Sequence, residues 1–340
     1  MSAPIVHGGG ITAAATALGG RPEDWLDLST GINPCPVALP EIPARAWHRL
    51  PDRHLVDAAR FAARDHYGSG EILPLPVPGT QSVIQLLPRL VGADERIAVT
   101  DDRIAVVSPT YGEYARAFTS AGFAVDAVND VAAIGAAHRL AVVVNPNNPD
   151  GRIWPAETLV ALHDRIKAAN GFLVVDEAFG DTNPALSLAS RAPQLSNLVI
   201  FRSFGKFFGL AGLRLGFAIA GENILERFED WLGPWAVSGP ALSLAASLLR
   251  SDVSPIHSRI EERSIGLHTA LDGAGLRIAG GTALFTLVND ARASDIYTYL
   301  CQHHILVRKF DNAPDWLRFG LAPDPAADRR LGEALQRFKR

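Results

Sequence analysis

One lysine of this chain has a sequence environment suited to covalent chemistry. Lys206 stands in the segment Ser-Phe-Gly-Lys-Phe-Phe-Gly, among aromatic residues and glycines instead of charges. Lysine occurs only at positions 167, 206, 309 and 339, so the chain uses arginine wherever a fixed positive charge suffices. An arginine does not give up its proton, whereas a lysine desolvated among aromatic residues has a lowered pKa and can form a Schiff base. We therefore favour Schiff-base chemistry at Lys206 over the ordinary role of a solvated surface lysine.

Other polar residues lie near Lys206 or at the ends of apolar runs. Ser203 lies three residues before Lys206 and Arg214 eight after it. Asp176 directly follows an apolar run, where an acid often only caps the next helix. A nucleotide-binding interpretation of Leu-Val-Val-Asp-Glu lacks the phosphate-binding loop G-x-x-x-x-G-K-[ST] that would complete it.

The elements that must position these residues repeat one pattern. Short β-branched apolar runs end in polar residues, and helical or turn segments follow them. The runs predict buried parallel strands near 105–107, 140–144, 172–175, 198–201 and 215–220, with a helix over 155–170. Parallel strands that alternate with helices predict a doubly wound α/β sheet, whose ligands bind beyond the carboxyl ends of the strands.

The flanking segments complete a predicted plan of an arm and two domains. We expect an N-terminal arm over 1–43, a large domain over 44–225 and a smaller α+β domain over 226–340. In the large domain, Pro78-Gly-Thr-Gln81 opens a predicted helix over 82–90. Backbone N–H groups at such a helix start bind phosphate, which makes Gly79, Thr80 and Gln81 candidates for a phosphate cradle. In the smaller domain, we expect helices over 222–231 and 241–250 and strands over 282–288 and 305–307.

The motifs around Ser203, Lys206 and Arg214 resemble those of the fold-type I aminotransferase superfamily, which uses pyridoxal 5'-phosphate (PLP). The resemblance implies that Lys206 carries PLP as a Schiff base and that Asp176 pairs with the ring nitrogen. It also implies that Ser203 and Arg214 bind the phosphate together with the cradle. Asn148, in Asn-Pro-Asn-Asn-Pro-Asp-Gly, corresponds to the partner of the phenolic oxygen, and Tyr111 to the residue that stacks on the ring. A turn and a core tyrosine are the structural alternatives for these last two.

Features outside this common core resemble the histidinol-phosphate aminotransferase branch and, within it, the threonine-phosphate decarboxylases of cobalamin biosynthesis. They are His7-Gly-Gly, Trp25-Leu-Asp-Leu-Ser-Thr-Gly-Ile-Asn-Pro34 and the lysine segment itself. The resemblance implies decarboxylation of L-threonine O-3-phosphate to (R)-1-aminopropan-2-ol O-phosphate. It places Arg318 on the substrate carboxylate and His7, Gly8 and Arg308 on the substrate phosphate. Two alternatives stay open: an aminotransferase for histidinol phosphate or a related phosphorylated amino acid, and a non-catalytic PLP-fold binding protein.

The chain departs from the aminotransferase pattern at two positions. Phe179 stands where transaminases often have a tyrosine that bonds the phenolic oxygen, so the electronics of the bound cofactor should differ. Leu50 stands where relatives have a tyrosine that reaches the cofactor phosphate of the partner subunit. The resemblance implies a homodimer, but this particular contact is in doubt.

Composition indicates a globular protein whose ligand is a small molecule. The chain has 340 residues, 48% of them hydrophobic, and a net charge of −4, which gives no basic surface for nucleic acid or a membrane. Residues 1–10 lack the pattern of a secretion signal, so we expect a cytoplasmic protein. Cys35 and Cys301 are expected to be free thiols, and Cys301, His303 and His304 are too tightly clustered for a metal site, so no metal is expected.

Overall fold

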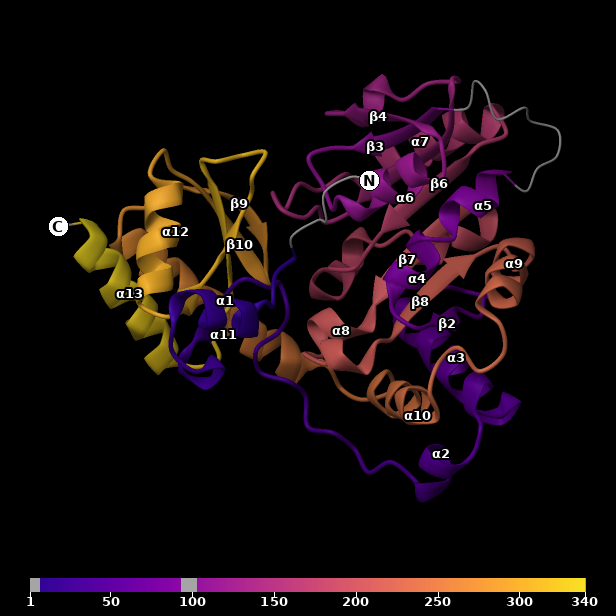
Figure 1. Ribbon diagram of the computed structural model, residues 1–340. Coiled ribbons are helices and arrows are strands. Elements are labelled where there is room, and N and C mark those ends of the chain that lie inside the picture. The colour runs from indigo at the N-terminus through magenta and orange to yellow at the C-terminus, as the bar shows by residue number, and fades with distance from the viewer. Residues whose placement is uncertain (1–6, 93–102, 340) are drawn as a thin grey trace.

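The computed structural model describes residues 7–92 and 103–339, and residues 1–6 of the predicted arm lie outside these ranges. A seven-stranded sheet forms the larger part of the molecule (Figure 1), with the strand order β2-β8-β7-β6-β5-β3-β4. Strands β3 to β7 run parallel to one another, whereas β8 is antiparallel to both of its neighbours. The strands are β2 (Leu75–Val77), β3 (Arg103–Val107), β4 (Ala124–Val128), β5 (His138–Val144), β6 (Phe172–Asp176), β7 (Leu198–Ser203) and β8 (Gly216–Ala220).

Helices cover both faces of this sheet, because alternate residues of each strand point to opposite sides. On one face, Ala141 and Val143 of β5 pack with α3 (Arg53–Tyr67), α7 (Ala156–Ala168) and α10 (Gly239–Leu248). On the other face, Leu140 and Val142 pack with α5 (Leu87–Gly92), α6 (Glu113–Ser120) and α9 (Glu222–Leu232). This arrangement confirms the doubly wound α/β class, because both faces of the strands are buried.

A second, antiparallel sheet with the order β12-β13-β10-β9 lies beside the first (Figure 1). Its strands are β9 (Ile278–Thr282), β10 (Phe285–Asn289), β12 (Arg308–Lys309) and β13 (Trp316–Gly320). The helices of this part are α11 (Ser254–Gly273), α12 (Ala293–Gln302) and α13 (Pro325–Lys339). The smaller C-terminal part therefore has the α+β composition that the sequence predicts.

The N-terminal segment packs against the C-terminal part of the chain. Its short strand β1 (Leu26–Asp27) pairs in parallel with β11 (Ile305–Leu306), and α1 (Ile11–Leu18) contacts α12. The short helix α2 (Ala44–His48) precedes the large sheet, α4 (Thr80–Ile84) follows its strand β2, and α8 (Phe204–Phe207) follows β7. The domain boundaries proposed from the sequence stay predictions.

Short 3-10 helices lie at Pro22–Asp24, Val131–Ala133, Gly180–Thr182, Pro184–Leu186, Ala189–Gln194 and Ala211–Leu213.

Three expectations about individual elements are wrong. The strand expected at 215–220 exists as β8 but runs antiparallel to β7. Its connection to β7 contains only the four-residue helix α8 and a 3-10 turn at Ala211–Leu213, and neither is a helix long enough to carry the chain back along β7 as a parallel crossover requires. The strand expected over 282–288 is two strands, β9 and β10, joined by a two-residue turn. The helix expected over 82–90 is interrupted between α4 and α5, with Pro88 near the start of α5.

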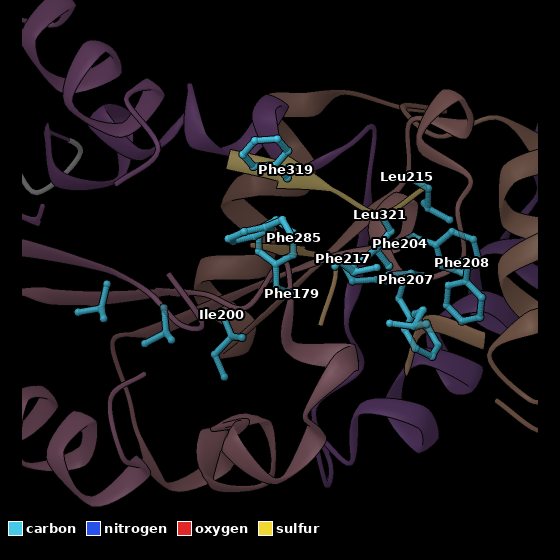
Figure 2. Packing of buried hydrophobic residues seen from close by; sticks show 14 of the residues in the cluster. Phe179, Ile200, Phe204, Phe207, Phe208, Leu215, Phe217, Phe285, Phe319 and Leu321 are labelled. Atoms are coloured by element: carbon cyan, nitrogen blue, oxygen red, sulfur yellow. The ribbon is translucent and has the colours of Figure 1, made fainter. Parts of the chain in front are cut away.

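Phenylalanines form the buried contact between the two parts of the molecule. The ring of Phe179, which follows β6, packs edge-on against Phe285 of β10 with 5.1 Å between centroids (Figure 2). Nearby, Phe204 and Phe208 stack at 4.5 Å, and both are fully buried. The segment around Lys206 is thus part of the core, so its backbone position is fixed by packing. No helix in residues 7–92 or 103–339 combines the length and apolar character needed to span a membrane.

Candidate active site

Neighbouring parallel strands bring the predicted site residues to one edge of the large sheet. Strand β6 ends at Asp176 and β7 ends at Ser203, and the two strands are paired in parallel. Lys206 follows in α8, one turn beyond Ser203. Every residue predicted to hold PLP lines a single cavity at this edge: Gly79, Thr80, Gln81, Tyr111, Asn148, Asp176, Ser203, Lys206 and Arg214.

Lys206 lies in surroundings that favour its neutral amine. Burial lowers the pKa of Lys206 to about 8, and the positive charges of Arg318 and Arg214 act in the same direction against the opposing charge of Asp176. Its Nζ lies 5.9 Å from the centroid of the Phe179 ring. A lysine with this pKa has a much larger neutral fraction near physiological pH than an ordinary lysine, and the neutral amine is the form that attacks an aldehyde.

Asp176 is a buried carboxylate held in a fixed orientation. Its Oδ2 accepts a hydrogen bond from the Tyr114 hydroxyl at 2.7 Å, and its Oδ1 accepts one from the Ala178 backbone N–H at 3.0 Å. Burial raises the pKa of Asp176 to about 6, although both hydrogen bonds and Lys206 oppose the rise. A cation placed against this carboxylate would restore its ionised form, so the group suits a protonated ring nitrogen.

Gly79, Ser203 and Arg214 form a site that fits a phosphate. Gly79 is the N-cap of α4 and has a φ of 74°, and a Cβ at this position would lie 2.7 Å from Arg214 Nη2. Glycine therefore lets the start of α4 approach the guanidinium. Arg214 itself has a positive φ of 54°, and non-glycine residues adopt this conformation mainly where function or packing demands it. Backbone donors, a hydroxyl and a guanidinium converge here as PLP phosphate binding requires.

Tyr111 lies beside the cradle at the border of a second cavity. Its hydroxyl donates to Gln81 Oε1 at 3.1 Å, and burial, with Glu113 and Asp176, raises the pKa of Tyr111 to about 12. The hydroxyl therefore stays protonated over the whole physiological range. The ring borders both cavities, as expected of a residue that stacks on a planar cofactor.

The four residues predicted to bind substrate line the second cavity, which shares Lys206, Asn148 and other residues with the first. Arg318 of β13 is buried and donates through Nη1 to Asn148 Oδ1 and through Nη2 to the Ser29 carbonyl at 2.9 Å. Burial, assisted by the charge of Arg308, lowers the pKa of Arg318 to about 10. Two arginine side chains that line one cavity favour the binding of an anionic ligand there. The four residues are His7, Gly8, Arg308 and Arg318.

Several residues that shape the site were not predicted from the sequence. Tyr114 and Glu113 sit in the first turn of α6, where periodicity gives only their helical position. Ser29 provides the carbonyl that Arg318 uses, and nothing in its sequence context distinguishes it from a loop serine. The sequence pattern offered no signal for Tyr114, because α6 begins at Glu113 and Tyr111 lies before this helix.

A buried ion network lies behind the cofactor cavity. Arg202 donates to Glu177 Oε2 at 2.7 Å and to Asp181 Oδ1 at 2.9 Å, and all three side chains are at most 3% exposed. Glu177 directly follows Asp176, and Arg202 directly precedes Ser203. Since breaking one partner of a buried pair costs several kcal/mol, on the order of 3–5, this network ties together the two strand ends that carry the site.

The two departures from the aminotransferase pattern occupy different surroundings. Phe179 is buried and borders both cavities. Because a phenylalanine stands here, the site has no hydroxyl at this position. Leu50 is 64% exposed on the surface of the single chain.

The lowered pKa of Lys206 predicts how the cofactor-free protein should capture PLP. The rate of adduct formation, followed by visible absorbance after rapid mixing, should rise with pH and level off above about 8, because deprotonation produces the reactive amine. A rise centred near 10.5, the usual value for lysine, would show that the site does not lower this pKa.

This chain is similar to known decarboxylases and to known aminotransferases. The aminotransferase class I and II family profile matches residues 23–335. A threonine-phosphate decarboxylase from Sinorhizobium sp is 62% identical over 339 residues, which is 100% of both chains, and one from Pseudomonas aeruginosa is 42% identical over 98% of each. This chain is also similar to the crystal structure of histidinol-phosphate aminotransferase from Sinorhizobium meliloti in complex with pyridoxal 5'-phosphate, with a TM-score of 0.83 at 20% identity. The match covers 99% of this chain and 95% of that chain. This chain belongs to the class I and II aminotransferase family.

Proposed function

We propose that this protein is a PLP-dependent decarboxylase that converts L-threonine O-3-phosphate to (R)-1-aminopropan-2-ol O-phosphate for cobalamin biosynthesis. The observation that carries the proposal is the position of Arg308 and Arg318 in the same cavity as Lys206. A substrate with two anionic groups and an amine matches this set of side chains. The names of the two full-length relatives support the same reaction.

Each predicted residue has a role in this proposal that its surroundings support. Asp176 and Lys206 act directly in the chemistry, and Arg318 binds the substrate carboxylate because it is buried next to Asn148 and the lysine. Arg308, His7 and Gly8 bind the substrate phosphate in the same cavity. The remaining roles concern the cofactor: Gly79, Thr80, Gln81, Ser203 and Arg214 bind its phosphate, Tyr111 stacks on its ring and Asn148 bonds its phenolic oxygen.

The residues divide the work of the reaction between binding and proton chemistry. When bound, PLP supplies an aldehyde for the substrate amine and a ring that accepts the electron pair left by the broken Cα–carboxylate bond. The carboxylate leaves as carbon dioxide, and Cα takes up one proton in its place. Lys206 Nζ, with a pKa of about 8, is suited to deliver that proton. Arg318 fixes the carboxylate, and therefore which Cα bond is aligned for cleavage.

We further propose that the protein is a homodimer. Several large apolar side chains are exposed on the single chain, and contact with a second copy would bury apolar surface of this kind. The cytoplasmic location expected from the sequence stays a prediction. The exposed residues include Trp47, Leu50, Phe61 and Trp235.

An assay of two reactions tests the proposed function. Protein reconstituted with PLP should release carbon dioxide from L-threonine O-3-phosphate without any added keto acid, and form one 1-aminopropan-2-ol phosphate per carbon dioxide. L-Threonine is the control, and its kcat/KM should be lower by a factor of about 100 or more because it leaves Arg308 and His7 without an anion. Amino transfer to 2-oxoglutarate from histidinol phosphate would identify an aminotransferase instead. Protein that shows neither reaction would support the binding-protein alternative.

A further inference from the structure

Glu113 is a buried carboxylate for which the proposed function has no role. It begins α6, and its side chain is only 6% exposed. Its Oε2 accepts from Gln81 Nε2 at 3.0 Å and from the exposed Gln85 at 3.5 Å. Its Oε1 lies 3.0 Å from His7 Nε2 and 3.6 Å from Arg116 Nη1. Both carboxylate oxygens are therefore engaged by other side chains.

These contacts connect parts of the chain that are far apart in sequence. His7 belongs to the N-terminal segment and lines the substrate cavity, whereas Gln81 belongs to the cradle of the cofactor cavity. Gln81 also accepts a hydrogen bond from the Tyr111 hydroxyl at 3.1 Å. Glu113 thus joins the N-terminal segment, the start of α4 and the Tyr111 segment at a single side chain.

The hydrogen bonds around Glu113 require its carboxylate to be the acceptor and its neighbours to be the donors. Because Gln81 Oε1 accepts from Tyr111, its amide nitrogen is turned toward Glu113 and must donate. An ionised carboxylate has only acceptors, so His7 must donate to it through Nε2. Gln81 and His7 contact different oxygens of Glu113, and in a glutamine one of these two positions would be an NH2 group that donates and cannot accept.

A simpler explanation for an acid at this position is its favourable interaction with the helix dipole of α6. That interaction requires neither burial nor contacts outside the helix, and burying a carboxylate is costly unless it is paired. Glu157 at the first turn of α7 shows the ordinary case, because its side chain is 76% exposed. The burial of Glu113 therefore points to its long-range partners.

The N-terminal segment is held across the substrate cavity at two points. At one end, His7 contacts Glu113. At the other end, the Gly9 backbone N–H donates to Ser29 Oγ at 2.7 Å, and a Cβ on Gly8 would lie 2.3 Å from the Ser29 carbonyl oxygen. The same carbonyl oxygen accepts from Arg318. His7 thus reaches the cavity from a segment whose far end is already fixed.

We propose that Glu113 is a positioning residue that holds His7 over the substrate cavity, and so sets the affinity for the phosphate-bearing substrate. The inference rests on the proposed function. Glu113 acts through His7 and does not itself touch the reacting atoms. Removing its charge frees the imidazole, so the substrate phosphate must then order the N-terminal segment as it binds.

Coupling between Glu113 and His7 is the decisive measurement. In Glu113→Gln we expect KM for L-threonine O-3-phosphate to rise about tenfold, with kcat changed by less than about threefold. His7→Ala should have a similar effect, and the double variant should be no worse than His7→Ala alone, because a residue that acts through His7 has nothing left to position. Glu157→Gln, at an exposed first-turn acid, is the matched control and should leave both constants unchanged.

A second measurement does not depend on turnover. Hydrogen exchange of residues 7–18 in the PLP-loaded protein without substrate should be faster in Glu113→Gln than in the wild type, and unchanged in Glu157→Gln. Equal exchange, additive losses in the double variant, or a lost visible absorbance of PLP in Glu113→Gln would each overturn the inference. If the wild type itself does not turn over threonine phosphate, the proposed function fails, while the exchange experiment still decides whether Glu113 holds the N-terminal segment.

Discussion

Lys206→Ala should lower the rate of carbon dioxide release by about a thousandfold or more. The variant loses the amine that holds the cofactor aldehyde and, in our proposal, the proton donor for Cα, so two functions disappear with one side chain. The rest of the site remains, because Ser203 and Arg214 are held by β7 and by the turn at Ala211–Leu213. PLP should therefore still bind, but without the visible absorbance of a covalent adduct.

Two further variants make the Lys206 result specific. Lys206→Arg keeps the positive charge but cannot give up its proton, so it should be as inactive as the alanine variant. Lys167→Ala removes an exposed lysine from the last turn of α7 and should change the rate by less than about twofold. Carbon dioxide release by Lys206→Ala at a tenth of the wild-type rate would contradict both the assignment of this lysine and the reaction built on it.

Asp176→Asn should lower kcat by about two to three orders of magnitude with little loss of stability. The amide has nearly the same shape, its oxygen can accept from the Ala178 N–H, and its NH2 group can donate to the Tyr114 oxygen. What it lacks is the negative charge that keeps the cofactor ring nitrogen protonated. Loss of one partner of a buried ion pair costs on the order of 3–5 kcal/mol, and each 1.36 kcal/mol is about tenfold in rate.

Tyr114→Phe is the matched control for Asp176. It removes one hydrogen bond to the carboxylate but keeps the charge, so the pKa of Asp176 should rise further above its value of about 6 in the cofactor-free protein. We expect a loss of kcat of about tenfold or less, which steady-state kinetics can separate from the larger effect of Asp176→Asn. If Asp176→Asn is no slower than Tyr114→Phe, the charge at position 176 is not what the reaction needs.

The sequence by itself determined the chemistry of the cofactor site. Ser203, Lys206 and Arg214 lie within one strand end and the turn after it, so their relative positions follow from local geometry. Asp176 ends a neighbouring strand, and the carboxyl ends of parallel strands meet at one edge of a sheet. The predicted doubly wound sheet was therefore enough to bring Asp176 and Lys206 to the same cavity, as the structure has them.

Only the tertiary structure decided which distant residues complete the site. The direction of β8, the pairing of β1 with β11 and the burial of Glu113 depend on what packs against each segment, and short-range patterns do not encode this. His7 and Glu113 are 106 residues apart, and their contact exists only because the N-terminal segment lines the substrate cavity and is held at Ser29. The function of a residue could be predicted where its motif is local in the sequence. The positioning of His7 depends on contacts between distant segments, and the periodicity of the sequence does not predict such contacts.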